Sequence, residues 1–314
     1  MKNKLRKLVI LCSVMATLVI LLSACNASPE ETTLFPIEIQ DQLGRVIKLD
    51  KVPQRIISLA PSNTEIIFAL GLADSLVAVT DYCNYPSEAE GKPSIGGFST
   101  PNVEEIIALS PDLILATSIH EDTVIPQLEE WGMTVFALNP KTTYEVLEAI
   151  TMVGEITGKT IEASDLVTNM QNRIKAITDI ISNLDEQEKP RVFYFVWHDP
   201  LMPAGSGTLQ DDLIANAGGI NCARQLTGYD SINLEAVIQM DPEVMIAGVS
   251  MGSGREQTFQ YIKDEPRLRD TSARLSDSIY AMDMDVSGRP GPRIVEALEK
   301  FAEFMHPQIF KDAQ

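Results

Sequence analysis

Cys25 stands in a sequence context that specifies a covalent reaction. The small residues Ser23 and Ala24 precede it, as suits a signal peptidase that holds the chain extended, and its thiol could then carry a diacylglycerol. A basic start precedes the uncharged stretch 8–22, which is shorter than the roughly 20 apolar residues that span a membrane as a helix. We expect residues 1–24 to be a lipoprotein signal peptide and Cys25 to be lipidated. An uncleaved membrane anchor is the alternative.

Residues near the C-terminus match the order of a serine-hydrolase triad. Ser250 lies in a G-x-S-x-G sequence after an apolar run, and Asp283 and His306 follow it. However, no HGGG-type oxyanion loop precedes Ser250, and His306 ends the last helical pattern instead of lying on a loop. Hydrolysis is therefore a distant alternative. The chain shows no metal-ligand spacing, phosphate loop or catalytic cysteine arrangement, so we expect no catalytic residue, metal site or cofactor.

The charge balance excludes several classes of partner. Removal of residues 1–25 takes away four basic and no acidic residues. The remaining chain has 25 − 4 = 21 Lys and Arg and 44 Asp and Glu, a formal charge of −23. Such a chain does not favour nucleic acid or an anionic membrane surface. Cys83 and Cys222 are too few for a disulfide scaffold, so a hydrophobic core must hold the fold. We interpret both as buried small apolar residues, with a disulfide as the alternative.

An internal repeat defines the elements that must position these residues. Residues 102–116, NVEEIIALSPDLILA, match residues 233–247, NLEAVIQMDPEVMIA, without a gap. Each copy is typical of a short amphipathic helix, a proline and an apolar run of strand length. Asn102 and Asn233 are expected helix N-caps, and the proline of each copy separates helix from strand.

Matches on both sides extend the repeat to a larger unit. Residues 135–139 parallel 279–283, and residues 65–71 more weakly parallel 212–218. A helical pattern follows each of the later strands. This alternation predicts an α/β fold with two similar lobes, each a parallel-type sheet flanked by helices.

One long helix is expected to join the two lobes. Residues 159–184 contain no Gly or Pro, and their apolar residues recur at helical spacing. A single helix is stiffer than a linker rich in Gly and Ser, so we expect the lobes to move by only a few degrees. The expected organisation is a tether over 25–36, an N-terminal lobe over 37–157, a connecting helix over 158–188 and a C-terminal lobe over 189–314.

The loops that follow the strands are expected to line one cleft between the lobes. In parallel sheets, ligands bind beyond the carboxyl ends of the strands. The whole chain is only 6% aromatic, yet these loops contain the aromatic residues Tyr82, Tyr85, Phe98, Trp197 and Tyr229, together with Met202. A planar ligand could stack there, although aromatic side chains also cover strand ends in other α/β proteins.

Five segments carry a resemblance to a known family. They are RIISLAPSNTEIIFALG (55–71), VTDYCNYP (79–86), NVEEIIALSPDLILA (102–116), GSGTLQDDLIANAGGINCA (205–223) and PGPRIVEALEKF (290–301). Over residues 37–310, the chain resembles the periplasmic binding proteins of iron-siderophore and cobalamin importers. The resemblance implies a class III fold, two lobes joined by one long helix, in a protein that is not an enzyme. It also implies a monomer on the extracytoplasmic face of the cell membrane, which delivers its ligand to an ABC transporter permease.

Within this family, the sequences DYCNYP, GGF and WHDPLMPAG resemble the cobalamin-binding branch. By position, Tyr82, Phe98 and Tyr229 fall where aromatic residues flank the corrin ring. Asp285 and Arg289 fall where polar residues meet its amide-bearing edge. The expected ligand-binding set is completed by Trp197, His198 and Met202.

Departures from that branch leave other ligands open. Phe98 and Tyr229 stand where tryptophans are expected, and Thr117 replaces another aromatic residue, which favours a looser pocket or a variant corrinoid. Catechol or hydroxamate siderophores usually meet several arginines, whereas these loops offer mainly Arg255 and Arg289. A ferric siderophore is therefore the less favoured ligand.

Haem is a third ligand that the sequence leaves open. His198, in the turn Trp197-His198-Asp199, is the better candidate to face a metal centre, whereas His120 is interpreted as a polar loop residue. The sequence thus favours cobalamin or cobinamide and keeps siderophore and haem as alternatives.

Glu104 and Glu235 occupy the same place in the two copies of the repeat. In the family that the chain resembles, a glutamate from each lobe meets arginines of the permease, so the resemblance assigns both residues to docking. Charge-assisted contacts at two points would fix the orientation over the pore. The alternative is that each glutamate only complements the dipole of its helix.

Overall fold

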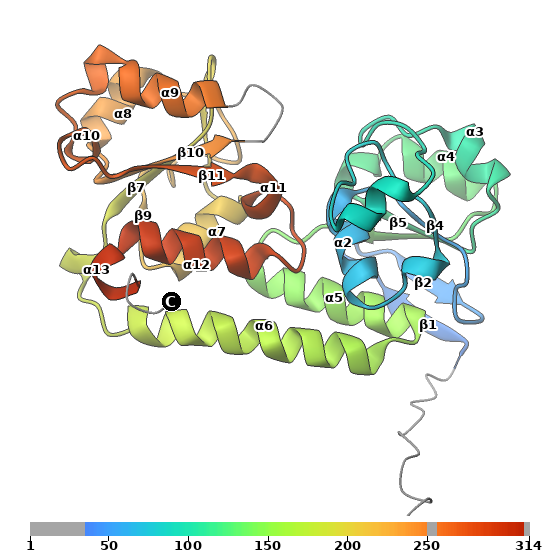
Figure 1. The fold of residues 1–314 in the computed structure, drawn as a ribbon. Coiled ribbons are helices and arrows are strands. Elements are labelled where there is room, and N and C mark those ends of the chain that lie inside the picture. The colour runs from blue at the N-terminus through green and yellow to red at the C-terminus, as the bar shows by residue number, and fades with distance from the viewer. Residues whose placement is uncertain (1–34, 250–255, 311–314) are drawn as a thin grey trace, which may run out of the picture. The chain divides into compact units, whose positions relative to one another are not determined.

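The two copies of the repeat belong to two β-sheets that share one strand order. Figure 1 labels β4 and β5 of the first sheet and β7, β10 and β11 of the second. The computed structural model describes residues 35–249 and 256–310, so the expected signal peptide, Cys25, Ser250 and Arg255 lie outside the described residues. The first sheet has the order β4 (Leu76–Ala78), β3 (Ile56–Ser58), β5 (Leu113–Thr117), β6 (Val135–Leu138). The second has the order β11 (Ile279–Asp283), β10 (Val244–Val249), β7 (Arg191–His198), β8 (Leu201–Pro203), and β9 (Ile220–Asn221) also pairs with β7.

The two sheets also share one register. Ile57 of β3 lies beside Ile114 of β5, and Phe193 of β7 lies beside Met245 of β10. Ile114 and Met245 are equivalent in the repeat, and their neighbours in β6 and β11 match in the same way. The sequence match therefore predicts the alignment of the strands as well as their order, and the two-lobed α/β fold is confirmed.

One edge of the second sheet departs from the parallel pattern. β8 pairs antiparallel with the end of β7, with His198 opposite Leu201, and the register shifts between Phe195 and Trp197. The sequence analysis places Trp197 and Met202 in a loop, and this prediction is wrong, because Trp197 belongs to β7 and Met202 to β8. The aromatic run at the end of β7 has high strand propensity, so the strand continues and turns back in a two-residue hairpin.

Both copies of the repeated helix begin and end in the same way. The side chains of Asn102 and Asn233 each accept a hydrogen bond from a backbone N–H of the first turn, so both expected N-caps are confirmed. The residue before each proline, Ser110 or Asp241, has a left-handed φ of 48° or 43°, which ends the helix. The two helices are α3 (Val103–Ala108) and α8 (Leu234–Met240).

Side chains of the central strands alternate between a shared core and an outer core. Leu113 and Leu115 of β5 face the shared core, whereas Ile114 faces the outer core of the first sheet. In β7, Tyr194 faces the shared core and Phe193 the outer core of the second sheet. The shared core joins both sheets to the buried faces of α5 (Thr143–Thr157), α6 (Thr160–Ile181), α7 (Leu209–Asn216) and α12 (Ile294–Met305).

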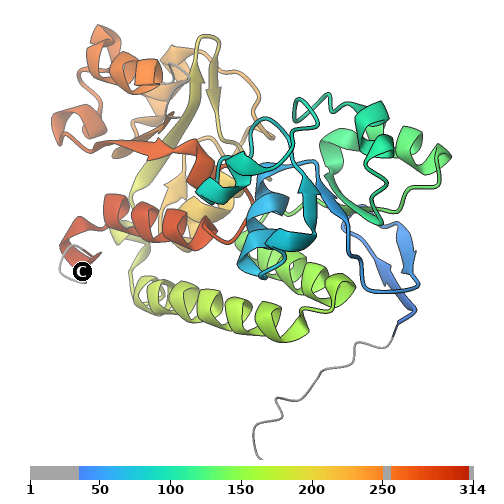
Figure 2. The same ribbon diagram turned by 45° about the vertical axis from the view of Figure 1, so that its right-hand side comes forward.

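The long helix α6 runs along both halves of the fold, the first half being the part with the first sheet and the second half the part with the second sheet (Figure 2). It matches the helix expected over residues 159–184, and it buries Met170, Ile177 and Ile181 in the shared core. A Cβ atom on Gly154 of α5 would lie 2.4 Å from the Cβ of Ala163, so the glycine permits the close approach of α5 and α6. Because one core joins both sheets, the lobe limits drawn from the sequence stay predictions.

The remaining described elements cover these sheets and helices. The strands and α-helices among them are β1 (Ile37–Gln40), β2 (Val46–Leu49), α2 (Pro61–Ala69), α4 (Val124–Glu130), α9 (Glu256–Asp264), α10 (Ser272–Leu275), α11 (Met284–Ser287) and α13 (Pro307–Phe310). Within the described ranges, no helix has the length and apolar character needed to cross a membrane. Cys83 and Cys222 are free; Cys83 is buried and Cys222 half-buried. Burial raises the pKa of the Cys222 thiol to about 11, so it stays protonated at neutral pH.

Candidate functional site

A cavity of about 470 Å³ lies at the carboxyl ends of the strands of the first sheet. Residues after β3, β4, β5 and β6 line it, and the segment after β11 adds residues from the second half. This is the edge of a parallel sheet at which ligands bind. The lining residues are Ala60, Pro61, Ser62, Tyr82, Phe98, Ser99, Thr117, Ser118, Ile119, Leu138, Asn139, Pro140, Lys141, Asp285, Gly288, Arg289 and Pro290.

The structure brings together half of the expected ligand-binding set. The residues that line the cavity are Tyr82, Phe98, Asp285 and Arg289. The residues that lie outside its lining are Trp197, His198, Met202 and Tyr229. The first group surrounds one space, whereas the second belongs to the edge hairpin and loops of the second half.

The aromatic residues of the second half are held by local contacts. The Trp197 indole Nε1 donates to the carbonyl oxygen of Asp199 at 2.6 Å, and Met202 lies opposite Trp197 in the hairpin. The Tyr229 hydroxyl donates to Oε1 of the buried Gln210 at 3.1 Å. These contacts explain how the side chains are placed without a ligand.

His198 faces the outer core of the second half. Its ring lies 5.1 Å from the ring of Tyr261, centroid to centroid, and its Nδ1 lies 3.1 Å from the Thr258 hydroxyl. Both partners belong to α9. The imidazole therefore contacts α9 and is not among the residues that line the cavity.

His120 supports the cavity wall from behind. It is fully buried, its Nε2 lies 2.7 Å from the carbonyl oxygen of Phe98, and its Nδ1 accepts the N–H of Thr117 at 3.1 Å. These partners fix a neutral ring with the proton on Nε2, and burial lowers the pKa of His120. Its ring also meets Phe98 edge to face, with centroids 5.6 Å apart. Both nitrogens are engaged, so His120 has no free lone pair for a metal.

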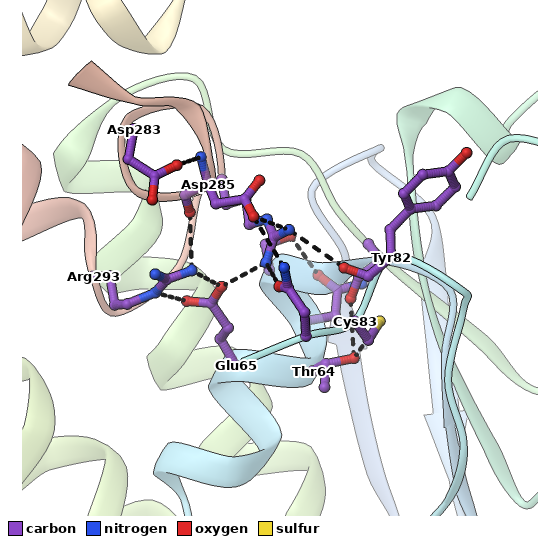
Figure 3. A network of polar contacts seen from close by, with 12 residues as sticks. Thr64, Glu65, Tyr82, Cys83, Asp283, Asp285 and Arg293 are labelled. Atoms are coloured by element: carbon purple, nitrogen blue, oxygen red, sulfur yellow. Dashed lines mark hydrogen bonds and ion pairs between the residues drawn. The ribbon is translucent and has the colours of Figure 1, made fainter. Parts of the chain in front are cut away.

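Tyr82 is the exposed aromatic side chain of the cavity. It is 61% exposed, and its ring points away from the polar network that its own backbone joins (Figure 3). Its carbonyl oxygen accepts a hydrogen bond from Nη2 of Arg289 at 3.3 Å. Tyr82 and Phe98 thus offer two aromatic surfaces, one open and one supported by His120.

A buried ion pair connects α2 to the start of α12 (Figure 3). The Glu65 side chain is 2% exposed and accepts from Nε and Nη2 of Arg293 at 2.9 and 2.6 Å. The guanidinium also stacks on the ring of Tyr85, 4.0 Å from its centroid. Burial alone would lower the pKa of Arg293, but the hydrogen bonds that it donates to Glu65 raise this pKa above its ordinary value. The guanidinium therefore keeps its charge.

Asp285 and Arg289 hold a side chain that comes from the other half of the protein. Nη2 of Arg289 lies 2.8 Å from Oδ2 of Asp285, and its Nη1 donates to Oδ1 of Asn84 at 2.7 Å. The Asn84 amide in turn donates from Nδ2 to Oδ2 of Asp285 at 3.1 Å. The three side chains close a ring of polar contacts beside the cavity.

Sequence reasoning missed Glu65, Asn84 and Arg293. One signal was present, because Glu65 interrupts an apolar helical run at the position that the repeat aligns with Asp212. A carboxylate at a matched position on a buried helix face indicates a paired charge. Asn84 and Arg293 have no comparable signal in the sequence, since their partners lie more than 200 positions away.

Comparison with known proteins decides the family. The model of the family described as periplasmic binding proteins matches residues 56–286. The chain belongs to this family. The ABC transporter substrate-binding lipoprotein YvrC of Bacillus subtilis is 30% identical to this binding protein, over 91% of each chain. A cobalamin-binding protein of Halobacterium salinarum is 29% identical, over 90% of this chain and 78% of its own.

Solved structures of binding proteins with different ligands have the same fold. The vitamin B12-binding protein BtuF of Vibrio cholerae is 26% identical, with a TM-score of 0.70 over 83% of this chain and 98% of that one. The haem-binding protein RhuT of Roseiflexus sp. RS-1 is 26% identical, with a TM-score of 0.72 over 83% and 99%. The binding protein therefore has the class III fold expected from its sequence. It is a solute-binding protein of the ABC importer family and not an enzyme.

The hydrolase alternative fails on geometry as well. Asp283 caps α11 through its Oδ1, next to the first turn of α12, whereas the buried His306 ends α12. The whole of α12, 12 residues and about 18 Å in length, lies between them in the chain. His306 Nε2 contacts the carbonyl oxygen of Gly218 at 3.2 Å, so it serves the packing of the second half.

The two repeated glutamates are exposed on equivalent helices of the binding protein. Glu104 lies in the first turn of α3 and Glu235 in the first turn of α8. Glu235 meets Nη1 of the exposed Arg267 at 3.3 Å, whereas Glu104 forms no ion pair with a described residue. Both carboxylates are thus accessible from solvent.

Proposed function

We propose that this binding protein captures a corrinoid, cobalamin or a close relative, in the cavity of the first sheet and delivers it to an ABC transporter permease. Lipidation of Cys25 would hold it on the extracytoplasmic face of the membrane, as the lipoprotein relative suggests. The tether would raise the concentration of loaded protein near its permease. The two exposed glutamates would then provide the docking contacts.

The observation that carries this proposal is the combination of aromatic and amide-compatible groups around one cavity. Tyr82 and Phe98 offer surfaces on which a flat macrocycle can stack. On the side of the cavity that the second half forms, Asp285 supplies a hydrogen-bond acceptor and Arg289 a donor. A corrin ring carries amide side chains that both donate and accept hydrogen bonds, so it matches this set of groups. The cobalamin-binding relative supports the same ligand class.

The charge around the cavity is less suited to an anionic ligand. Among the described lining residues, Lys141 and Arg289 are the cations, and Asp285 and Glu65 both contact the Arg289 guanidinium. Of the described lining cations, only Lys141 would thus be left to meet a ferric siderophore or the propionates of haem. The corrinoid, whose amides are neutral, does not require it.

Haem is the second candidate, and Tyr82 is the observation that favours it. A phenolate can ligate haem iron, and the Tyr82 side chain is exposed at the cavity. The haem-binding structure of the same fold is consistent with this alternative. His120 gives it no support, because both of its nitrogens are engaged.

A direct titration tests the proposal. The mature chain without its lipid, residues 27–314, would be titrated with cobalamin, cobinamide, ferric siderophores and haem, with calorimetry and tryptophan fluorescence as readouts. We expect saturable binding of both corrinoids at one site per chain. Binding of haem or a siderophore without binding of either corrinoid would overturn the ligand assignment and leave the family unchanged.

A further inference from the structure

The Asp285–Arg289 pair already holds a primary carboxamide, that of Asn84. The amide oxygen accepts from Nη1 of Arg289 at 2.7 Å, and the amide nitrogen donates to Oδ2 of Asp285 at 3.1 Å. The pair belongs to the second half and lines the cavity, whereas Asn84 belongs to the first half and is exposed. Arg289 as donor and Asp285 as acceptor therefore bind the two ends of one amide group.

This geometry distinguishes an amide from a carboxylate. A carboxamide presents one acceptor and one donor, as the pair requires. A carboxylate in the same place would have no proton to give to Asp285, and two anionic groups would face each other within hydrogen-bond distance. The pair is thus complementary to a neutral amide, although it contains an arginine.

The pair does not depend on Asn84 for its own position. Nη2 of Arg289 contacts Oδ2 of Asp285 at 2.8 Å, and the guanidinium also meets Glu65 and the carbonyl oxygen of Tyr82. The backbone N–H of Asp285 donates to Oδ1 of Asp283 at 2.8 Å. The Arg289 side chain is only 14% exposed, so it is fixed before any ligand arrives. Displacement of Asn84 would leave the two recognition groups in place.

We propose that Asn84 is an internal stand-in for the ligand: it occupies a carboxamide site formed by Asp285 and Arg289, and a primary amide of the bound ligand displaces it. This inference rests on the proposed corrinoid function. It specifies that the cavity prefers corrinoids with amide groups to those with carboxylates. The competition weakens binding by a constant factor for every amide ligand. It also keeps the charged pair hydrogen-bonded while the cavity is empty.

The test compares Asn84→Ala with the unaltered mature chain. The ligands are cobinamide, whose ring carries primary amides, and cobyrinic acid, which has carboxylates on the same ring. Two hydrogen bonds at an exposed site compete with the ligand, so removal of Asn84 should tighten cobinamide binding about three- to tenfold. Cobyrinic acid should gain less than twofold. Asn183→Ala, at a distant exposed asparagine, is the control and should change neither affinity.

A second variant tests the recognition groups themselves. In Asp285→Asn the acceptor charge is removed, so the preference for cobinamide over cobyrinic acid should fall by about tenfold or more. Unchanged or weaker cobinamide binding by Asn84→Ala would overturn the stand-in role. Unchanged binding would mean that Asn84 does not compete with the ligand, and weaker binding would mean that Asn84 contacts the ligand. An unchanged preference in Asp285→Asn would overturn the carboxamide site. If no corrinoid binds the unaltered chain or any variant, the proposed function fails first, and the site fails with it.

Discussion

Glu65 and Asp212 hold equivalent places in the two halves, and each contacts the start of a helix of the opposite half, α12 for Glu65 and α5 for Asp212. Glu65 of α2 meets Arg293 at the start of α12, 2.6 Å from its Nη2. Asp212 of α7 accepts the backbone N–H of Thr143, the first residue of α5, at 2.7 Å. The two carboxylates thus join the halves crosswise, as a pseudo-twofold arrangement requires.

Removal of the Glu65 charge should strongly destabilise the protein. The carboxylate is 2% exposed and Arg293 only 14% exposed, so Glu65→Gln would leave a buried guanidinium with an incomplete partner. Loss of one member of a buried ion pair costs about 3–5 kcal/mol, and the amide retains part of the contact, so we expect a loss of about 3 kcal/mol in the free energy of unfolding. Urea unfolding monitored by circular dichroism would measure it.

The matched control for that variant is Glu299→Gln. Glu299 pairs with Arg173 on the outer side of α6 and α12, where the two side chains are 39% and 36% exposed. An exposed pair contributes at most about 1 kcal/mol. A Glu65→Gln chain as stable as the control would show that the crosswise contact does not stabilise the fold.

The fold was predictable from sequence because the repeat encodes one unit twice. Ile114 and Met245 match in sequence, and each pairs with its neighbouring strand in the same register. Local signals were also sufficient for the caps at Asn102 and Asn233, because an N-cap is decided within four residues. Where a pattern repeats or acts locally, sequence reasoning succeeds.

The candidate site was predictable only in part, since it depends on contacts across the chain. Asn84 meets Asp285 and Arg289 across about 200 positions, and no spacing in the sequence signals this. His198 shows a different cause. By alternation it would share the face of Tyr194, but the register shift after Phe195 turns it toward α9. A single irregularity in a strand exchanges the two faces of the residues beyond it.

Tyr82 should distinguish stacking from iron ligation. If the ring stacks on a corrinoid, Tyr82→Phe should keep the affinity within about twofold, whereas Tyr82→Ala should lower it about five- to tenfold. If the phenol ligates haem iron, Tyr82→Phe should abolish the absorption change on haem binding. Parallel titrations with cobalamin and haem measure both. Equal losses of cobalamin affinity in the two variants would argue against stacking.

Buried histidines should make the stability fall in mildly acidic solution. Burial lowers the pKa of His120 and of His306 below the ordinary value of about 6.5. The unfolded chain therefore takes up protons first as the pH falls. The free energy of unfolding has its full value above about pH 6.5. Below that pH it declines by up to about 1.4 kcal/mol per pH unit for each histidine.

Urea unfolding at several pH values between 7.5 and 5.5 would measure this decline. His120→Gln keeps a side-chain amide that can donate to the Phe98 carbonyl oxygen but does not titrate, and His306→Gln removes the second group in the same way. The double variant should show a flatter profile than the unaltered chain. An unchanged slope would place the acid sensitivity in other groups.

Glu104 and Glu235 should be required for transport and dispensable for ligand binding. Both lie exposed in the first turns of matched helices, outside the residues that line the cavity. The Glu235–Arg267 contact is exposed on both sides, so a permease arginine could replace it at little cost. In Glu104→Ala/Glu235→Ala, uptake into cells or proteoliposomes should be lost, while corrinoid affinity changes less than twofold.

Glu105→Ala gives the matched control for docking, because Glu105 is an exposed glutamate on the same helix as Glu104 but has no counterpart in the second copy, where Ala236 stands. Its uptake should remain near that of the unaltered chain. Binding of the loaded protein to permease should also weaken as salt is raised, since paired charges guide the encounter. Equal uptake defects in both variants would point to general acidity, and normal uptake in the double variant would exclude docking through these two residues.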